Sequence, residues 1–96
     1  MKKERIILPT SSFIAFVDFF PEDKRLEFTI RKSGKKYAAK ITKKLFDELK
    51  KANNKGSFIS INIISKIQCN YVEIVPAATI ELITLPKSKY YINLAI

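Results

Sequence analysis

The 96-residue sequence contains no histidine and no tryptophan, a single cysteine and only two glycines. Without histidine the chain lacks the commonest general base and the commonest metal ligand of proteins. The two glycines, Gly34 and Gly56, are too few for a glycine-rich phosphate loop or a dinucleotide-binding turn. We therefore expect a protein that is not an enzyme and that uses neither a metal nor any other cofactor.

The single cysteine and the short apolar runs also bear on the cellular location of the protein. Cys69 cannot form a disulfide within the chain, and we expect it to be a small buried or half-buried side chain rather than a reactive thiol. No apolar run approaches the roughly 20 residues that span a bilayer, and Ile6-Ile7-Leu8 is too short for the core of a signal peptide. These features predict a cytoplasmic protein that does not enter a membrane.

The chain is strongly basic, and its charge is concentrated in one segment. Lysine and arginine together number 18 against nine acidic residues, which gives a formal net charge of +9. Residues 31–55 hold ten of the basic residues but only Asp47 and Glu48 as acidic ones, so this quarter of the chain carries a net charge of +8. A charge concentrated in this way predicts binding to an anionic partner.

Strand patterns fill the first part of the chain. A β-branched and aromatic run extends from Ser11 to Phe20, and apolar and polar residues alternate from Arg25 to Lys32. Gly34 supplies the positive φ that a tight hairpin needs, and the alternation resumes after it as far as Ile41. The pattern predicts three strands, of which the second and third form an antiparallel pair.

The apolar spacing then changes from the period of a strand to that of a helix. Leu45, Phe46 and Leu49 fall on one face of a helix, and lysines occupy most of the other positions. Thr42 is suited to cap the first turn. One amphipathic helix is therefore predicted over about 43–54.

The second half of the chain returns to residues that favour strands. Phe58–Ile64, Val72–Val75 and Ile80–Ile83 are rich in β-branched side chains, and two prolines divide this half into short strands. The predicted fold class is α+β: a mainly antiparallel sheet with a single amphipathic helix, in the order β-β-β-α-β-β plus one or two short strands. We expect one domain over residues 1–96. The predicted core contains Phe28, Ile30, Leu45, Phe46, Leu49, Ile61 and Ile63.

The end of the chain points to self-association. Tyr90 to Ile96 is apolar to the last residue, and the late strands leave a sheet edge that needs covering. We therefore predict a homo-oligomer, most simply a dimer.

A set of residues between Ser12 and Ile63 forms a pattern with a known counterpart. Its members are Ser12, Ile14, Phe19, Leu26-Glu27-Phe28, Gly34, Tyr37, Phe46, Leu49 and the run Ala52 to Phe58. The pattern resembles the KTSC domain, a short module at the C-terminus of some lysyl-tRNA synthetases that also occurs as a stand-alone protein. The KTSC-like part covers residues 12–63 and leaves 65–96 as a C-terminal β extension, and the family's tyrosine-x-tyrosine is Tyr37-Ala38-Ala39 here. Because the family is presumed to bind RNA, the resemblance implies RNA as a partner.

The lysine-rich segment and two aromatic residues define the candidate binding site. Lysine meets phosphate as a hydrated point charge, so the expected binding is salt-sensitive and largely independent of sequence. Tyr37 and Phe58 either stack on unpaired bases or belong to the core. The candidate residues are Arg31, Lys35, Lys36, Tyr37, Lys40, Lys43, Lys44, Lys50, Lys51, Lys55 and Phe58.

Two functions fit these observations. The first is a non-catalytic module that binds RNA or single-stranded nucleic acid through the lysine-rich segment. The second is a small inhibitor or sequestering protein of the phage type, which as an oligomer holds an anionic nucleotide or blocks a host protein. Salt-dependent affinity for long strands favours the first, and tight capture of one small nucleotide favours the second.

Overall fold

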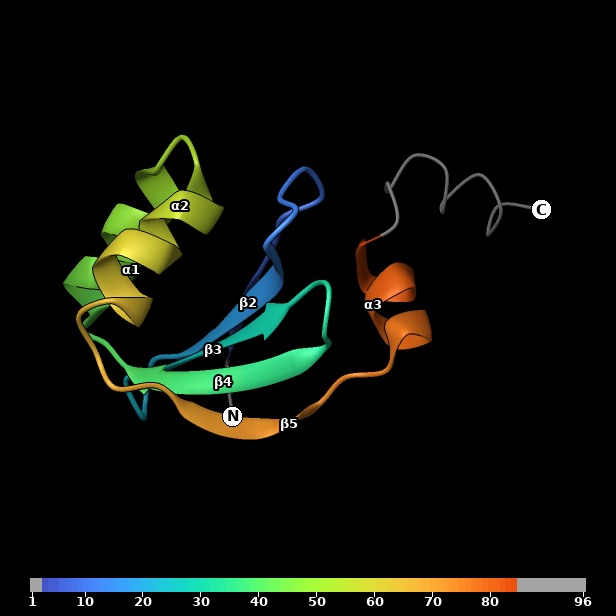
Figure 1. Ribbon diagram of the computed structural model, residues 1–96. Coiled ribbons are helices and arrows are strands. Elements are labelled where there is room, and N and C mark those ends of the chain that lie inside the picture. The colour runs from blue at the N-terminus through green and yellow to red at the C-terminus, as the bar shows by residue number, and fades with distance from the viewer. Residues whose placement is uncertain (1–2, 85–96) are drawn as a thin grey trace.

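The computed structural model describes residues 3–84 as one antiparallel sheet of five strands with helices on both of its faces (Figure 1). The strands are β1 (Glu4–Ile7), β2 (Ile14–Phe20), β3 (Arg25–Ile30), β4 (Lys35–Lys40) and β5 (Asn70–Ile74). The helices are α1 (Lys43–Lys51), α2 (Lys55–Ile59), which continues as the π-helical turn η1 (Ser60–Ile64), and α3 (Ala77–Thr84). None of the helices within residues 3–84 is both long and apolar enough to cross a bilayer.

The strands follow one another across the sheet in the order β1-β2-β3-β4-β5. Gly34 makes the tight connection between β3 and β4 possible, because its φ of +75° is one that side chains rarely allow. The end of β5 also approaches this turn, and Val75 N–H donates to the carbonyl of Gly34 at 2.7 Å. A Cβ at position 34 would collide with the main-chain oxygen of Val75. Gly34 is therefore required both by its own turn and by the strand beside it.

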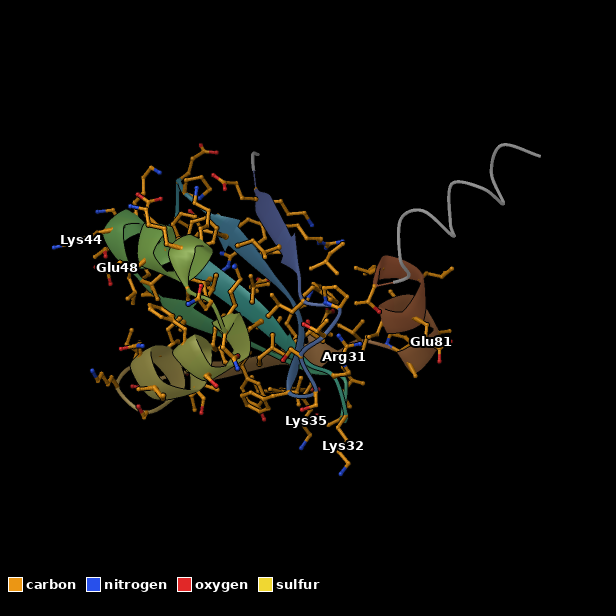
Figure 2. All side chains as sticks on the ribbon, turned by 90° about the horizontal axis from the view of Figure 1, so that it is seen from above. Arg31, Lys32, Lys35, Lys44, Glu48 and Glu81 are labelled. Atoms are coloured by element: carbon orange, nitrogen blue, oxygen red, sulfur yellow. The ribbon has the colours of Figure 1, made fainter. Side chains whose placement is uncertain are left out.

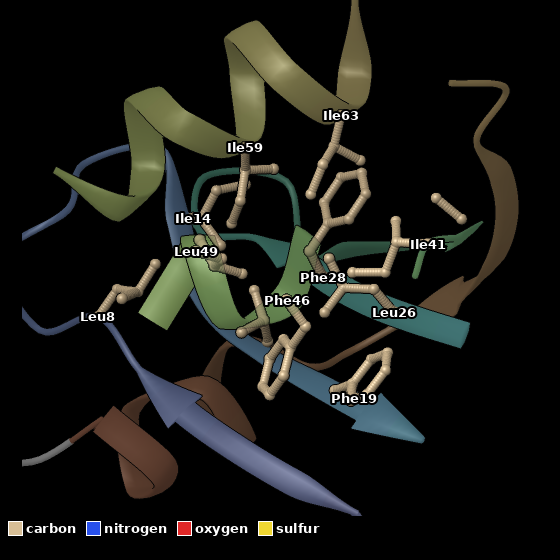
Figure 3. Close-up of a cluster of buried hydrophobic side chains, with 12 residues drawn as sticks. Leu8, Ile14, Phe19, Leu26, Phe28, Ile41, Phe46, Leu49, Ile59 and Ile63 are labelled. Atoms are coloured by element: carbon tan, nitrogen blue, oxygen red, sulfur yellow. The ribbon is translucent and has the colours of Figure 1, made fainter. Parts of the chain in front are cut away.

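The main core lies between one face of the sheet and the α1 and α2–η1 helices (Figure 3). Thr42 starts α1, since its Oγ1 accepts a 3.1 Å hydrogen bond from Leu45 N–H. This start directs Phe46 onto the sheet, where its ring stacks on Phe19 with 4.3 Å between centroids. The buried residues of this core are Leu8, Ile14, Val17, Phe19, Leu26, Phe28, Ala39, Ile41, Phe46, Leu49, Ile59 and Ile63.

The opposite face of the sheet combines a small apolar cluster with paired charges. Helix α3 packs there, and its Ile80 joins Phe16 in the cluster. Further along the same face, Asp18 is 1% exposed and receives two hydrogen bonds from the Arg5 guanidinium, at 2.7 and 3.0 Å. This pairing raises the pKa of Arg5 above its ordinary value, because the carboxylate favours the charged guanidinium.

The structure confirms the α+β class, the mainly antiparallel sheet and the helix that begins after Thr42. Phe28, Phe46, Leu49 and Ile63 are buried as predicted. The predicted core residues Ile30 and Leu45 are half-buried and pack against the same core. The structure differs from the predicted elements at three places. The edge strand β1 at the start of the chain was not predicted, and two segments in the second half are helices where strands were predicted.

The isoleucine-rich segment after residue 57 is helical, so the prediction of a strand there is wrong. Asn54 caps this helix through its side-chain oxygen. Ile59 and Ile63, four residues apart, are fully buried, whereas Ile61 between them is 61% exposed. The prediction of a buried Ile61 is also wrong, because the segment presents one helical face to the sheet and not alternate residues.

The strand predicted over Ile80–Ile83 is instead the helix α3, so the fold has more than the single helix expected. The helix begins directly after Pro76, whose carbonyl accepts a hydrogen bond from Ile80 N–H at 3.1 Å. Proline suits this position because the first helical residues have no partner for their N–H groups. The C-terminal extension thus contributes both β5 and α3, and Tyr90 to Ile96, on which self-association was predicted, lies outside the described residues.

Candidate nucleic-acid interface

The lysine-rich segment does not form one continuous surface. Lys35 and Lys40 are the first and last residues of β4, which places them about 17 Å apart at the usual rise of a strand. Figure 2 shows Arg31, Lys32 and Lys35 at one end of the molecule and Lys44 of α1 at another. The ten basic residues that adjoin one another in the sequence are therefore divided between separate regions.

Three lysines of the candidate site are engaged in ion pairs. Lys36 lies 3.3 Å from Glu73 and 3.7 Å from Glu27, on the charged face of the sheet. Lys43 lies 3.4 Å from Asp47, and Lys50 contacts Asp47 as well as Glu4 of β1. These acidic neighbours offset much of the positive charge that α1 and β4 would present to a ligand.

The remaining lysines of α1 and its approach are exposed. Lys40, Lys44 and Lys51 have no ion-pair partner within residues 3–84, but Glu48 is exposed on the same helix as the last two. An outer helix face with both signs of charge attracts a polyanion only weakly. This face adds to the overall positive field without forming a defined site.

The two aromatic candidates pack against the core. Tyr37 is half-buried between the ring of Phe28, at 5.9 Å, and that of Tyr71, also at 5.9 Å between centroids. Phe58 is half-buried at the edge of the same core. The arrangement of both rings matches the alternative in which they are core residues.

Arg31 fixes a loop. Its Nε donates to the carbonyl of Ser11 and its Nη2 to the carbonyl of Leu8, both at 2.7 Å. Ser11 in turn accepts hydrogen bonds at its Oγ from the N–H groups of Phe13 and Ile14. These contacts define the shape of the loop between β1 and β2, which we call the 8–13 loop.

A cleft of about 750 Å³ lies between the 8–13 loop and the connection from α1 to α2. The two walls meet closely, since a Cβ on Gly56 would lie 2.7 Å from Ser11 Oγ. Lys55 lines the cleft, and its Nζ donates to the carbonyl of Ala52, which leaves two of its three N–H donors for a ligand. The other polar groups come mainly from Thr10, Ser11, Ser12, Asn53, Asn54 and Ser57.

A second hollow of about 500 Å³ adjoins the same loop. Ser12 and Phe13 line both hollows, and Lys32 and Ser33 of the β3–β4 turn line only the second. Phe13 is 39% exposed although it is a large apolar side chain. This exposed aromatic residue therefore borders both hollows.

No carboxylate lines either hollow. The surface that Lys32, Phe13 and Lys55 share, which we call the Phe13 strip, thus combines one exposed aromatic residue with a lysine in each adjoining hollow. Of the predicted site residues only Lys55 lines the strip, while Arg31 supports it from behind and Lys35 follows Lys32 in the same turn. An electropositive surface with an accessible ring has the chemistry that single-stranded nucleic acid requires.

The residue pattern places Phe13 in the strand predicted over Ser11 to Phe20 and does not single it out as a binding residue. The strand begins only at Ile14, and its register shifts between Ile14 and Phe16, so alternation does not extend back to residue 13. Ser12 and most of the run from Ala52 to Phe58 were singled out by the resemblance to the KTSC domain, and Lys55 and Phe58 also by charge and aromatic character. The structure brings these two segments together as opposite walls of one cleft.

The thiol of Cys69 contributes nothing to this surface. It is half-buried against the core, and its Sγ donates to the carbonyl of Ile67 at 3.4 Å. Burial raises the pKa of the thiol, which disfavours the reactive thiolate.

The fold and the strip define a small α+β domain with a polar cleft between a loop and a helix pair. The chain has the fold of the KTSC domain protein of Yersinia pestis, with a TM-score of 0.65 and 23% sequence identity over 75% of this chain and 100% of that chain. The resemblance inferred from the sequence is thereby confirmed at the level of the fold. No family model matches the sequence, and no curated protein matches it.

Proposed function

We propose that the protein is a non-catalytic module that binds single-stranded nucleic acid, RNA above all, along the Phe13 strip. The observation that carries this proposal is the exposed Phe13, which borders two hollows without carboxylates, one of them lined by Lys55 and the other by Lys32. Stacking of a base on an aromatic side chain contributes about 1–3 kcal/mol and is available to every base.

The lysines outside the strip support binding in a different way. Lys40, Lys44 and Lys51 are exposed and raise the positive field around the molecule, which accelerates the approach of a polyanion without fixing its position. The strip then provides the contacts that hold the strand. In this proposal most of the net charge of +9 attracts the strand from a distance, and only the few cations at the strip contact it.

The single, half-buried thiol suits a reducing compartment, and we accordingly propose that the protein acts in the cytoplasm.

Capture of a free nucleotide is the second candidate function, and the larger cleft favours it. Its volume of about 750 Å³ is within the range of small-molecule sites in proteins. A ligand in such a site would depend on pocket contacts more than on total charge, so its affinity would change little with salt.

Fluorescence anisotropy with labelled single-stranded RNA, duplex DNA and a mononucleotide, each at two salt concentrations, tests the proposal. We expect affinity for the single strand that falls steeply with salt and exceeds the affinity for the duplex. Tight and salt-insensitive binding of the mononucleotide alone would favour the second candidate. Absence of binding to all three ligands would overturn both.

A further inference from the structure

The larger cleft has walls of neutral polar side chains, and this chemistry can discriminate between nucleic acids. Seven of its fourteen lining residues carry a hydroxyl or a carboxamide, and none carries a carboxylate. Hydroxyls and carboxamides both donate and accept hydrogen bonds, whereas a lysine ammonium only donates. Walls of this kind match a ligand group that itself both donates and accepts.

Two of these side chains are held in place and still have donors to offer. Ser11 Oγ accepts from Phe13 N–H at 3.2 Å and from Ile14 N–H at 3.1 Å, which leaves the hydroxyl hydrogen available. Asn54 Oδ1 accepts from Ser57 N–H at 3.0 Å, which leaves its amide NH₂ available. The donors therefore stand in a defined arrangement before any ligand arrives.

The cleft also has a fixed shape. Arg31 fastens one wall by its two hydrogen bonds of 2.7 Å to main-chain carbonyls of the 8–13 loop. Gly56 on the other wall allows the main chain to approach Ser11 Oγ more closely than any side chain would permit. A preformed site loses little entropy on binding, so a single additional hydrogen bond to the ligand appears as a difference in affinity.

The position of Phe13 decides which part of a nucleotide the cleft receives. Because Phe13 lines the cleft and its ring is exposed, a base stacked on the ring places its attached sugar beside the cleft. The ribose 2′-hydroxyl, which both donates and accepts, is the group that separates RNA from DNA. Lys55 in the same cleft is then placed for the adjoining phosphate.

We propose that the larger cleft binds the ribose of the nucleotide stacked on Phe13, and that hydrogen bonds to its 2′-hydroxyl make the protein prefer RNA to DNA. The inference rests on the proposed function, because it requires a strand on the Phe13 strip. It goes further in naming the chemical group that is recognised and the walls that recognise it.

The test compares oligouridylate, oligodeoxyuridylate and 2′-O-methyl oligouridylate of equal length, which share one base and differ only at the sugar. We expect the wild-type protein to bind the ribose form about fivefold more tightly than the deoxy form, the factor that one ordinary hydrogen bond supplies. The methylated form should lose most of this advantage. The double variant Ser11→Ala/Asn54→Asp removes the two free donors, the Ser11 hydroxyl and the Asn54 amide, and keeps the side-chain oxygen at position 54 that caps α2, so it should reduce the preference. Thr79→Ala removes an exposed hydroxyl on α3 and should leave the preference unchanged.

Equal affinity of the wild-type protein for the ribose and deoxy forms would overturn the inference and leave the proposed function standing. A preference that survives both 2′-O-methylation and the double variant would also overturn it. Failure to bind any of the three strands would overturn the proposed function as well. The comparison of oligonucleotides needs only the wild-type protein, so an unstable variant cannot obscure the result.

Discussion

The Arg31 guanidinium donates a 2.7 Å hydrogen bond to the main-chain carbonyl of Ser11, a residue 20 positions away in the sequence. A second hydrogen bond of 2.7 Å joins the same guanidinium to the carbonyl of Leu8. Arginine suits this task because its planar fork presents several donors in fixed directions. A residue predicted to bind phosphate thus fixes the loop that carries Phe13.

Replacement of Arg31 should therefore affect stability and binding together. Arg31→Ala removes two charge-assisted hydrogen bonds and should lower the free energy of unfolding by about 2–3 kcal/mol. Affinity for single-stranded RNA should fall even where the variant is fully folded, because the loop loses its anchor. Chemical denaturation and anisotropy measure the two effects, and Lys32→Ala in the same turn is a control that should weaken binding without loss of stability.

Charge reversal at the strip should weaken binding more than reversal on α1. Lys32→Glu/Lys55→Glu introduces two acids at the Phe13 strip, and we expect the affinity to fall at least about tenfold at moderate salt. Lys43→Glu/Lys50→Glu changes the net charge equally but alters lysines that already face Asp47 and Glu4, so the loss should be smaller. Equal losses for the two double variants would show that total charge, and not the strip, governs binding.

Asp18 should be a determinant of stability. Its buried carboxylate is hydrogen-bonded twice by Arg5, and Asp18→Ala would leave that guanidinium without its partner. Because Arg5 remains partly exposed to water, we expect a loss of about 2–3 kcal/mol, below the usual range for a fully buried pair. Asp47→Ala, which breaks surface pairs, should cost less than about 1 kcal/mol in the same denaturation experiment.

Self-association remains a prediction, and the edge strand β5 provides a test of it. Tyr71, Val72 and Ile74 are exposed on this strand, and an exposed apolar edge favours pairing with another strand. If two copies pair along β5, light scattering should give twice the mass of the chain, and Val72→Lys should return it to the monomer. Leu82→Lys adds the same charge on α3 and should leave the dimer intact; a monomeric wild-type protein would contradict the prediction.

The sequence predicted those elements whose periodicity and end signals agree. Strands β2 to β4 and helix α1 combine a clear period with a turn or cap, such as Gly34 and Thr42. Around Ile59, Ile61 and Ile63 the sequence fits both the alternation of a strand and the spacing of a helix. Only the burial of Ile59 and Ile63, four residues apart, against the sheet distinguishes the helix from the strand. High β-propensity misled there because packing against the rest of the chain overrides it.

The candidate site was less predictable because charge pairing depends on the tertiary fold. Lys36 meets Glu73 and Lys50 meets Glu4, partners 37 and 46 residues away in the sequence. A run of lysines therefore does not indicate which of them are available to a ligand. The exposure of Phe13 likewise depends on the residue at which the 8–13 loop ends and β2 begins. The residue pattern alone does not show this boundary.

The fluorescence of a single tryptophan at position 13 tests most directly whether RNA binds at the Phe13 strip. The chain contains no tryptophan, so Phe13→Trp places one tryptophan at an exposed position that borders both hollows. Titration with unlabelled single-stranded RNA should quench its emission along the same curve as binding measured by anisotropy, because a base stacks on the ring. Tyr71→Trp, on the exposed edge strand, should show little change in the same titration. Full binding of RNA without quenching at position 13, or equal quenching at both positions, would contradict the assignment of the Phe13 strip as the nucleic-acid interface.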